Sequence, residues 1–583
     1  MKSKILWEAK QSQKNKSNLF RYENFLSSKY KFIPTQNYNK LHKWSVDNPK
    51  KFWNSIWDFS KVKGIKNNNY KKSNIFFKNK FLKNSKLNFA ENLLSKNDDK
   101  KAITFISEIG YKKVRTWKEL NNNVYKIVNF FNSIKIKEKD RIAAYLPNLI
   151  ETVESFIATS AIGAIWSSCS PDFGANGVIE RFSQINPKVL IICDRYFYNG
   201  KEINVIERLP LILKKIKSIK NVIIINYPGK PLLKLKKLKN IKYINWDFIM
   251  KINAKKIVFK KYDFEQELAI LYSSGTTGKP KCICHRSGGV LLQHLKEHQL
   301  HNEINDNDNI FYFTTCGWMM WNWLVSALAS RASIVLFEGF PMYRRNDLLI
   351  KLADEEKITL FGVSAKYIDA LNKSGILNKK KYKLKNLRTI CSTGSPLSED
   401  GFKFIYKKVK SDVHLASISG GTDIVSCFVL GNIYDPVISG EIQNRGLGMD
   451  VDILNDYGKS IKNKKGELVC KNAFPSTPLK FWKDKNNLKF KEAYFNKFKN
   501  IWHHGDYAEV KNSGGFIIYG RSDTTLNPGG VRLGTAEIYS EVEKFKEIKE
   551  SIAIGQSWDN DIRIILFVIM NQKFKLNNKL ISE

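Results

Sequence analysis

The sequence lacks the long apolar stretches that mark membrane proteins and secretory leaders. No run of about 18 uncharged apolar residues occurs in its 583 residues, which argues against a membrane-spanning helix. The first residues, Met1 to Glu8, contain no apolar signal core. We therefore expect a cytoplasmic protein without a membrane partner.

Cysteine is sparse, and its spacing is unlike that of a disulfide framework. The eight cysteines are scattered without paired spacing, as is typical of reduced thiols in the cytosol. The closest pair, Cys282 and Cys284, precedes His285, but a metal site would need further ligands at fixed spacing. We predict that both cysteines are small side chains on a buried strand.

Acidic residues are few compared with basic ones. The 97 Lys and Arg residues exceed the 55 Asp and Glu residues by 42, which is the formal net charge. Such a charge can indicate a nucleic-acid-binding protein. Here the lysines are spread along the chain and do not gather beside stacking aromatic residues, which favours a Lys-rich and Asn-rich composition bias. We expect no nucleic-acid partner, although a positive field can collect anionic substrates.

The chain is too long for one compact domain, and roughly three or four domain-sized units are expected. Short β-branched runs at 189–193 and 222–225 alternate with helical periodicity, for example over 117–131. This alternation predicts an α/β fold. Residues 228–262 are interpreted as a basic surface excursion.

The pattern of predicted secondary structure changes near residue 440. Short strands predicted at 450–454, 466–470 and 516–519 are broken by Gly, Pro and Asn turns, as in a small β-barrel. We therefore predict a large domain of two α/β subdomains and a small β-barrel-like subdomain. Aromatic residues among lysines in residues 1–85 predict short amphipathic helices that cap this domain.

A loop rich in hydroxyl groups and glycine carries the clearest chemistry. Residues 271–281 read LYSSGTTGKPK and follow a short apolar run that predicts a buried strand. Gly275 and Gly278 allow the backbone to approach a ligand and to adopt positive φ. Lys279 and Lys281 offer positive charge. Hydroxyl donors come from Ser273, Ser274, Thr276 and Thr277. The loop is predicted to hold a polyphosphate.

The loop differs from the kinase-type P-loop. Pro280 follows Gly278-Lys279, where a P-loop requires Ser or Thr for magnesium. The loop instead resembles the phosphate loop of the adenylate-forming enzymes, which include acyl-CoA synthetases, adenylation domains and luciferases. Further segments resemble that family in the same order, and the series spans about 260 residues: SISGGTDIV at 417–425, WHHGDY at 502–507, GRSD at 520–523 and LNPGGVRLGTAE at 526–537.

The resemblance implies roles for residues at a nucleotide site. Thr422 would contact the α-phosphate, and Asp423 would take the Mg²⁺ position, where most members have glutamate. Asp506 and Arg521 would bind the ribose, and Asp523 would be the pivot of a small mobile α+β C-terminal domain. The other implied positions are Thr276, Thr277 and Lys281 at the β- and γ-phosphates, Gly394, Ser395 and Pro396 beside adenine, Gly421 in the nucleotide site, Asn527 and Arg532 near the nucleotide phosphate, and Gly529 and Gly530 along the coenzyme A tunnel.

Within these enzymes the chain is most similar to the acetoacetyl-CoA synthetases, in stretches such as 87–94, 163–174 and 440–448. This similarity implies ligation of acetoacetate to coenzyme A through an acyl-adenylate, with ATP and Mg²⁺ as cofactors and release of AMP and pyrophosphate. It also implies an AMP-binding domain over 86–522 and a lid domain over 523–583, after the N-terminal region 1–85. Another short- or medium-chain acyl-CoA synthetase is the alternative.

Comparison with the acyl pocket of the acetyl-CoA synthetases predicts a substrate acid longer than acetate. Gly420 stands where acetyl-CoA synthetases have a tryptophan that closes the pocket, so the missing indole would leave room. Trp318 and Met319 would form the opposite wall, together with Met320. Lys366 has two interpretations: it meets a polar acyl group, or, as we favour, it lies on the surface.

The C-terminal domain of the family carries a Gly-Lys segment whose lysine reaches the reacting carboxylate. No such segment occurs before Glu583, and about 60 residues follow the predicted hinge. We therefore expect a truncated lid domain, and three explanations are open: a truncated sequence or frameshifted gene, a second chain that supplies the rest, or a degenerate enzyme. The first is favoured because the nucleotide motifs are intact.

Overall fold

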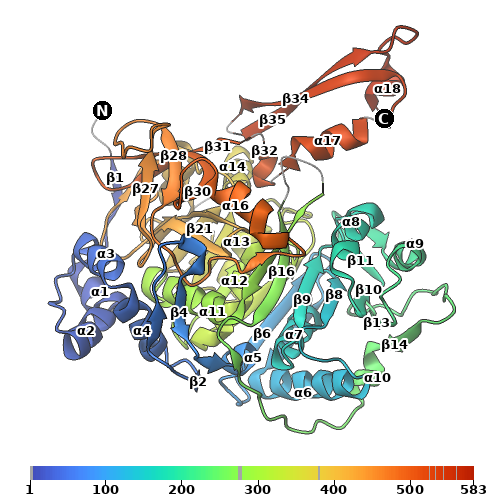
Figure 1. Ribbon diagram of the computed structural model, residues 1–583, viewed down its shortest axis with the longest axis horizontal. Helices are drawn as coiled ribbons and strands as arrows, with labels where there is room; N and C mark the ends of the chain where they lie inside the picture. The colour runs from blue at the N-terminus through green and yellow to red at the C-terminus, as the bar shows by residue number, and fades with distance from the viewer. Residues whose placement is uncertain are drawn as a thin grey trace.

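Two large sheets, each built mainly from parallel strands, form the body of the molecule (Figure 1). The computed structural model describes residues 4–273, 279–377, 381–523, 525–531, 533–542, 544–559 and 561–582. Strands buried on both faces need not alternate with polar residues, which explains the continuous apolar runs in the sequence. Val189–Cys193, for example, is buried at every position. The predicted α/β fold is confirmed.

The first sheet has eight strands in the order β14-β13-β10-β8-β9-β16-β17-β29. The pairs from β14 to β16 are parallel, and the last two pairs are antiparallel. The strands are β8 (Arg141–Tyr145), β9 (Ile165–Cys169), β10 (Val189–Cys193), β13 (Asn221–Ile225), β14 (Lys242–Asn245), β16 (Glu267–Ser273), β17 (Lys281–Arg286) and β29 (Lys480–Phe481). Cys282 and Cys284 lie buried on β17, as predicted.

Residues 228–262 were expected to form a basic surface segment, and this is wrong for the middle of the segment, residues 242–250. β14 extends the first sheet by parallel pairing with β13, and α10 (Trp246–Met250) follows it directly. Ile244, Trp246 and Ile249 are buried. This short edge strand is hard to recognise in the sequence, because it contains lysine and asparagine and only a few of its side chains are buried.

The second sheet has seven strands in the order β22-β21-β20-β18-β19-β6-β7, and only the β6–β7 pair is antiparallel. The strands are β6 (Lys101–Ser107), β7 (Lys112–Thr116), β18 (Asn309–Tyr312), β19 (Ser333–Glu338), β20 (Leu360–Ser364), β21 (Thr389–Thr393) and β22 (His414–Ser417). The carboxyl ends of such parallel strands face one edge, where ligands bind in α/β proteins.

Three helices are buried along their whole length: α7 (Ile150–Ala161), α11 (Ser287–Lys296) and α12 (Met319–Ser326). The other helices of the large domain are α5 (Phe89–Leu93), α6 (Trp117–Ser133), α8 (Ala175–Ile185), α9 (Leu209–Lys215), α13 (Leu348–Glu355), α14 (Ala365–Lys373), α15 (Glu399–Phe404) and α16 (Leu488–Phe495). A capping box of Thr116 and Glu119 sets the start of α6.

An aromatic stack joins the first sheet to α12. Trp166 of β9 and Trp321 of α12 lie with ring centroids 6.3 Å apart and planes 15° apart, and both are fully buried. The Trp321 Nε1 donates a hydrogen bond to Asn148 Oδ1 at 2.9 Å. This stack is therefore a main contact within the core.

We expect Trp321→Ala to lower the free energy of unfolding by about 3–5 kcal/mol, because it opens a cavity and leaves Asn148 Oδ1 without its donor. A thermal melt followed by circular dichroism measures the drop in Tm. The matched control is Trp558→Ala, whose side chain is 57% exposed and should change the Tm little. Equal Tm values for the two variants would contradict this account of the core.

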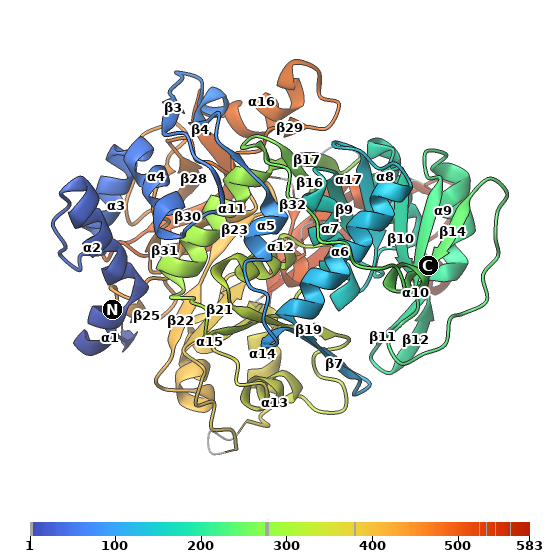
Figure 2. The ribbon, with the colours of Figure 1, turned by 90° about the horizontal axis from the view of Figure 1, so that it is seen from below.

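The N-terminal region is helical, as predicted. Its α-helices are α1 (Gln11–Lys16), α2 (Asn18–Tyr30), α3 (Tyr38–Asp47) and α4 (Pro49–Phe59), and it also contains the short strands β1 (Ile5–Trp7), β2 (Gly64–Ile65), β3 (Asn69–Lys71) and β4 (Lys80–Lys83). Figures 1 and 2 show these helices at the opposite end of the molecule from α8–α10. Asn18 Nδ2 donates to the Ile304 carbonyl at 3.0 Å, and Tyr38 Oη to the Arg445 carbonyl at 2.5 Å. The region is thus fixed to the large domain.

A smaller antiparallel sheet carries the order β27-β28-β30-β31. Its strands are β27 (Val451–Leu454), β28 (Gly466–Cys470), β30 (Trp502–Val510) and β31 (Phe516–Arg521). Phe516 of β31 also exchanges two backbone hydrogen bonds of 2.8 Å with Ile442, so the sheet continues beyond β31, in keeping with the predicted β-barrel-like subdomain.

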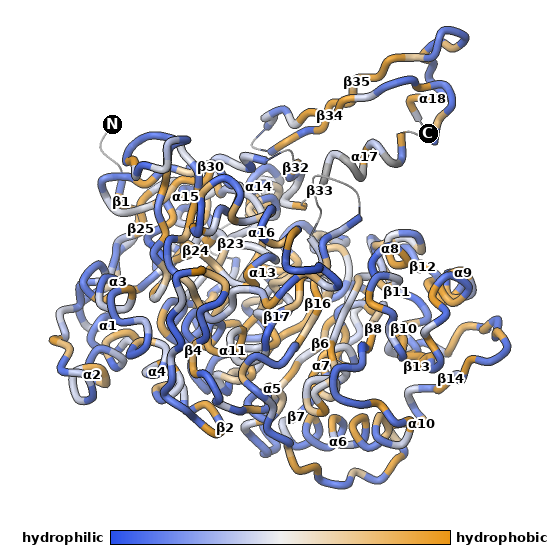
Figure 3. The backbone as a smooth tube through the Cα atoms, viewed as in Figure 1, coloured by the Kyte–Doolittle hydropathy of each residue, from blue (hydrophilic) through white to orange (hydrophobic). Residues whose placement is uncertain are grey.

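The C-terminal part combines a helix with a long hairpin, the predicted α+β pattern. Its elements are β32 (Thr525–Leu526), β33 (Leu533–Gly534), α17 (Thr535–Val542), β34 (Ile548–Trp558), β35 (Asp561–Met570) and α18 (Asn578–Ser582). Figure 1 shows the hairpin projecting from the body, and Figure 3 shows apolar stretches along it. Within the described residues β35 pairs with β34 alone. No described helix is long and apolar enough to cross a membrane.

Candidate active site

A cavity of about 370 Å³ lies where the two sheets, the smaller sheet and the C-terminal part meet. The predicted site residues that line it are Ser273, Trp318, Met319, Gly394, Ser395, Pro396, Gly420, Gly421, Thr422, Asp506, Arg521, Asn527, Gly529 and Gly530. The predicted residues Ser274, Gly275, Thr276, Thr277, Gly278 and Arg532 lie outside the described residues. The motifs scattered over the sequence therefore converge on one cavity.

The ends of the phosphate loop are held by strand pairing. Ser273 closes β16 and faces Lys281, the first residue of β17, in antiparallel register. The Lys281 Nζ lies 3.4 Å from Asp423 Oδ1 and 5.4 Å from the ring centroid of Tyr494. The described ends of the loop thus lie side by side in the first sheet, with Lys281 beside the Asp423 carboxylate.

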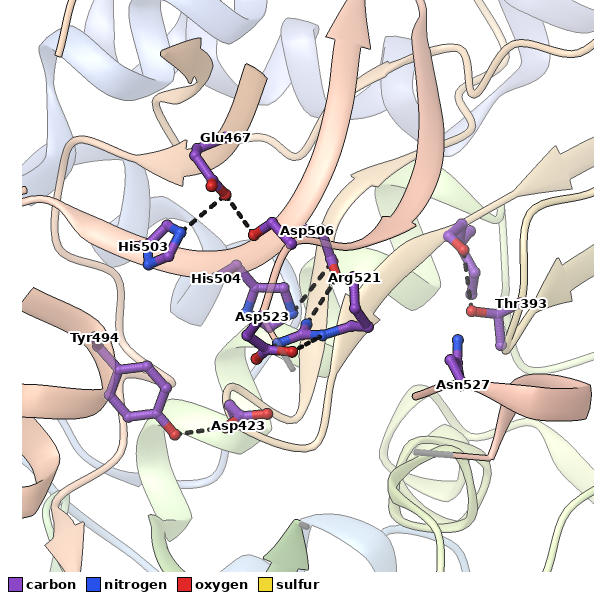
Figure 4. A network of polar contacts seen from close by, with 12 residues as sticks. Thr393, Asp423, Glu467, Tyr494, His503, His504, Asp506, Arg521, Asp523 and Asn527 are labelled. Carbon is purple, nitrogen blue, oxygen red and sulfur yellow. Dashed lines mark hydrogen bonds and ion pairs between the residues drawn. The ribbon is translucent and has the colours of Figure 1, made fainter. Parts of the chain in front are cut away.

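Asp423 is a buried carboxylate beside the cavity. It follows β23 (Ser419–Gly421) in a turn, and its side chain is 1% exposed. Its Oδ1 accepts a hydrogen bond from Tyr494 Oη at 2.5 Å (Figure 4). A buried charge needs compensation, and the ammonium of Lys281 and the phenol of Tyr494 supply it.

Arg521 lies between two carboxylates at the end of β31. Its Nη1 contacts Asp506 Oδ1 at 2.7 Å, and its Nη2 pairs with Asp523 (Figure 4). Burial opposes the charge, but the two carboxylates outweigh it and raise the pKa of Arg521 above its usual value. Gly505, with φ of +79°, makes room for the guanidinium, since a Cβ there would lie 2.6 Å from Nη2. The predicted ribose residues and the predicted hinge residue form one charged cluster.

Glu467 anchors the segment that leads to this cluster. Its carboxylate accepts hydrogen bonds from His503 at 2.9 Å, from Lys497 at 2.7 Å and from Ser522 Oγ at 2.6 Å. Burial alone would raise the pKa of Glu467, but these donors lower it from 4.5 to about 2. Glu467 therefore fixes the residue directly before Asp523.

We expect Glu467→Gln to lower the Tm at pH 7, with a loss of about 1–3 kcal/mol. A carboxylate whose pKa is depressed in the folded state stabilises it fully above the unfolded pKa, here 4.5, and ever less as the pH falls toward 2. Thermal melts between pH 7 and pH 3 should therefore show the difference from the parent protein shrinking below pH 4.5. Glu492→Gln, on the exposed side of α16, is the control. A difference that stays constant with pH would contradict the assignment.

The C-terminal part reaches the cavity through Asn527, Gly529, Gly530, Val531 and Leu533. Asn527 Nδ2 donates to the Gly394 carbonyl at 3.0 Å, and a Cβ on Gly530 would lie 2.9 Å from the Gly394 carbonyl carbon. Lys366 forms an ion pair with Asp561 at 2.9 Å, whose other oxygen accepts from the Gly529 N–H at 2.9 Å. Lys366 is thus a partly exposed residue that contacts the C-terminal hairpin, as the favoured interpretation held.

Gly420 lines the cavity near its buried end. A Cβ there would lie 2.0 Å from the Ser426 carbonyl oxygen and 2.6 Å from Cys427 Cα, because β23 and β24 (Ser426–Leu430) approach closely. The glycine therefore allows this strand pairing, and its role in the acyl pocket stays a prediction. Tyr312 and Met320 line this buried end together with Ser426 and Cys427.

Comparison with known proteins agrees with the motifs. Residues 90–476 match the sequence model of the AMP-binding enzyme family. The chain is 46% identical to an acetoacetyl-coenzyme A synthetase of Rhizobium meliloti (strain 1021), over 94% of this chain and 84% of that protein. The chain belongs to the acetoacetyl-CoA synthetase family of AMP-binding enzymes. It is also 41% identical to the acetoacetyl-CoA synthetase of Gallus gallus, over 100% of this chain and 88% of that protein. The solved structure of the acetoacetyl-CoA synthetase from Streptomyces lividans superposes with a TM-score of 0.84 at 32% identity, covering 99% of this chain and 88% of that one.

Two residues at this acetoacetyl-CoA synthetase site were not singled out from the sequence. Tyr494, on α16, stacks on Trp502 at 3.9 Å and donates to Asp423, which lies 71 positions earlier. No local pattern signals such a contact. His504 lies 3.7 Å from Asp506 Oδ2 and packs beside Gly421, where a Cβ would be 3.1 Å from its Cε1. Its place in the WHHGDY motif could have marked it.

The residues present fit the Mg²⁺ ion that family membership implies. Mg²⁺ binds proteins through one or two carboxylates together with substrate phosphates and water. Asp423 is a buried carboxylate beside the predicted phosphate loop and in contact with Lys281. Among the described residues there is no group of three or more His, Cys, Asp and Glu that could hold a metal ion. Asp423 is therefore the candidate ligand, with phosphate oxygens completing the shell.

Proposed function

We propose that this protein ligates acetoacetate to coenzyme A, driven by ATP, through an acyl-adenylate, and releases AMP and pyrophosphate. The observation that carries the proposal is this cavity, because it adjoins the charged cluster of Asp423, Asp506 and Arg521 and also has a buried end. A nucleotide and a short acid can therefore meet in it. We take the acid to be acetoacetate because the relatives are named acetoacetyl-CoA synthetases.

We propose these residue roles for the nucleotide. Asp506 and Arg521 bind the ribose, Thr422 contacts the α-phosphate, and Lys281 approaches the outer phosphates. Thr276, Thr277 and Arg532 are assigned to phosphate binding from the motifs alone. Gly394, Ser395 and Pro396 flank the adenine, and their position on the cavity wall supports this role.

Mg²⁺ held by Asp423, when bound, would neutralise phosphate charge that builds up as pyrophosphate leaves. The Tyr494 hydrogen bond and the Lys281 ammonium keep the Asp423 carboxylate in one orientation. Groups fixed in this way before the reaction stabilise developing charge without reorganisation.

The proposed reaction has two steps, formation of the acyl-adenylate and transfer of the acyl group to coenzyme A. A carboxylate oxygen of acetoacetate attacks the α-phosphorus, the bond to the bridging oxygen breaks, and pyrophosphate carries away that electron pair. The thiolate sulfur of coenzyme A then attacks the acyl carbon, and the carbon–oxygen bond breaks as AMP leaves. The protein mainly positions the reactants and stabilises charge.

We propose residues 86–522 as the adenylation domain and 523–583 as a lid that turns about Asp523 between the two steps, with 1–85 as a helical cap. The contacts of Asn527 with Gly394 and of Lys366 with Asp561 support a docked lid. Gly529 and Gly530 on the cavity wall support a path for the pantetheine arm there. Domain rotation would exchange these contacts.

The test is acid-dependent pyrophosphate release from ATP by the purified full chain. We expect kcat/KM for acetoacetate to exceed those for acetate, butyrate and 3-hydroxybutyrate. A preference for another acid would indicate a different short- or medium-chain acyl-CoA synthetase. ATP binding in a calorimeter without any acid-dependent release would indicate a protein that only binds nucleotide.

A further inference from the structure

Tyr312, the last residue of β18, has an unpaired hydroxyl group at the buried end of the cavity. Its side chain is 2% exposed, it lines the cavity, and its Oη has no hydrogen-bond partner among the described residues. A buried phenol normally finds a partner, because an unsatisfied hydroxyl loses the hydrogen bonds that water would make. The missing partner therefore points to a ligand.

The ring of Tyr312 is held in one place. Tyr312 pairs with Gly362 of β20, where a Cβ would lie 2.1 Å from the Tyr312 Cδ2, so only glycine leaves room for the ring. On another side Trp323 lies edge-on, with ring centroids 6.0 Å apart, and its Nε1 donates to Glu297 Oε2 at 2.9 Å. A hydroxyl on such a fixed ring is placed before the ligand binds, which lowers the entropy cost of binding.

The hydroxyl of Ser426, which also lines the cavity, already has hydrogen-bond partners within the protein. It accepts from Gln293 Nε2 at 2.8 Å and donates to the Glu297 carboxylate. Cys427 is a weak donor, and burial raises the pKa of its thiol, so it stays neutral. Burial also raises the pKa of Tyr312, which keeps its proton for donation.

Only two described side chains lining the cavity carry a buried oxygen without a partner, Ser273 and Tyr312. Ser273 begins the phosphate loop and lies on the nucleotide side, at the end of β16. Tyr312 ends β18 of the second sheet and lies near Cys427. Apart from Ser273, Tyr312 is therefore the described cavity-lining side chain that offers the acid a buried hydroxyl without a partner.

We propose that Tyr312 determines the specificity for a 3-oxo acid by donating a hydrogen bond to the oxygen on C3 of the substrate. This inference rests on the proposed function. Butyrate has a methylene group at C3, so it would leave the Tyr312 hydroxyl buried and unpaired. A site built for a hydrogen bond rejects an analogue that lacks the partner more strongly than an apolar pocket can.

The test compares kcat/KM for acetoacetate and butyrate in the parent protein and in Tyr312→Phe, measured as pyrophosphate release. We expect the variant to lose about 10- to 100-fold with acetoacetate and to change less than about twofold with butyrate, since the phenyl ring keeps the packing. The matched control is Tyr367→Phe, which removes another buried hydroxyl without a partner that does not line the cavity. It should leave the ratio unchanged.

Two outcomes separate the inference from the function on which it rests. If the parent protein prefers acetoacetate and Tyr312→Phe keeps that preference, the role of Tyr312 is wrong while the function stands. If the parent protein shows no preference for acetoacetate, the proposed function itself fails. A drop with both acids to the same extent, with an unchanged Tm, would also overturn the role, because it would show a general effect on catalysis.

Discussion

Asp423→Asn is expected to lower kcat/KM for acetoacetate-dependent pyrophosphate release by about 10²- to 10³-fold, the cost of losing one fixed electrostatic group. The carboxylate is 1% exposed, and it contacts Lys281 at 3.4 Å and Tyr494 at 2.5 Å. An amide keeps the shape but removes the charge that would hold Mg²⁺ and orient the lysine. Initial rates at several Mg²⁺ concentrations measure the loss, which should include a weaker dependence on Mg²⁺.

The control for this change is Asp400→Asn, since the Asp400 side chain is 78% exposed and lies on α15. It should leave the rate and the Mg²⁺ dependence unchanged. If Asp423→Asn retained the parent rate with an unaltered Mg²⁺ dependence, Asp423 would not be the metal ligand.

Arg521→Gln should be the most destabilising of the charge substitutions. Its guanidinium faces Asp506 at 2.7 Å and also Asp523, while its own side chain is only 9% exposed. Breaking a buried pair by removing one partner costs about 3–5 kcal/mol, because the remaining carboxylate, here that of Asp506, is left buried without its partner. A thermal melt should show a Tm several degrees lower, and calorimetry should show weaker ATP binding.

Arg563→Gln provides the comparison, because Arg563 is exposed on the C-terminal hairpin. Its Tm should stay close to that of the parent protein. If Arg521→Gln had the same Tm as the parent protein and bound ATP equally well, the charged cluster would neither stabilise the fold nor belong to the nucleotide site.

Much of the fold could be predicted, because its signals are local. Continuous apolar runs such as Val189–Cys193 are typical of buried parallel strands, and the structure places them as predicted. The edge strand β14 was missed, since it has solvent on one side and too few buried residues to differ from a loop. The strand order of the smaller sheet could not be derived, because it depends on contacts that the short strands do not specify locally.

The candidate site was predictable where glycine, charge and hydroxyl groups recur in motifs. Arg521 and Asp506 were both assigned to the ribose, and the structure brings them into contact. The contact of Tyr494 with Asp423 could not be derived, because it joins residues 71 positions apart through the packing of α16. The close approach of Gly420 to β24 could not be derived for a related reason, because β24 lies outside the motif.

The most direct test of the account follows the oxygen atoms of the acid. Acetoacetate labelled with ¹⁸O in its carboxylate is incubated with ATP, Mg²⁺, coenzyme A and the full chain, and the products are analysed by mass spectrometry. Attack of the carboxylate on the α-phosphorus predicts one ¹⁸O atom in each AMP, unlabelled pyrophosphate and formation of acetoacetyl-CoA. Label in inorganic phosphate together with ADP, or no transfer of label to AMP, would contradict the acyl-adenylate route.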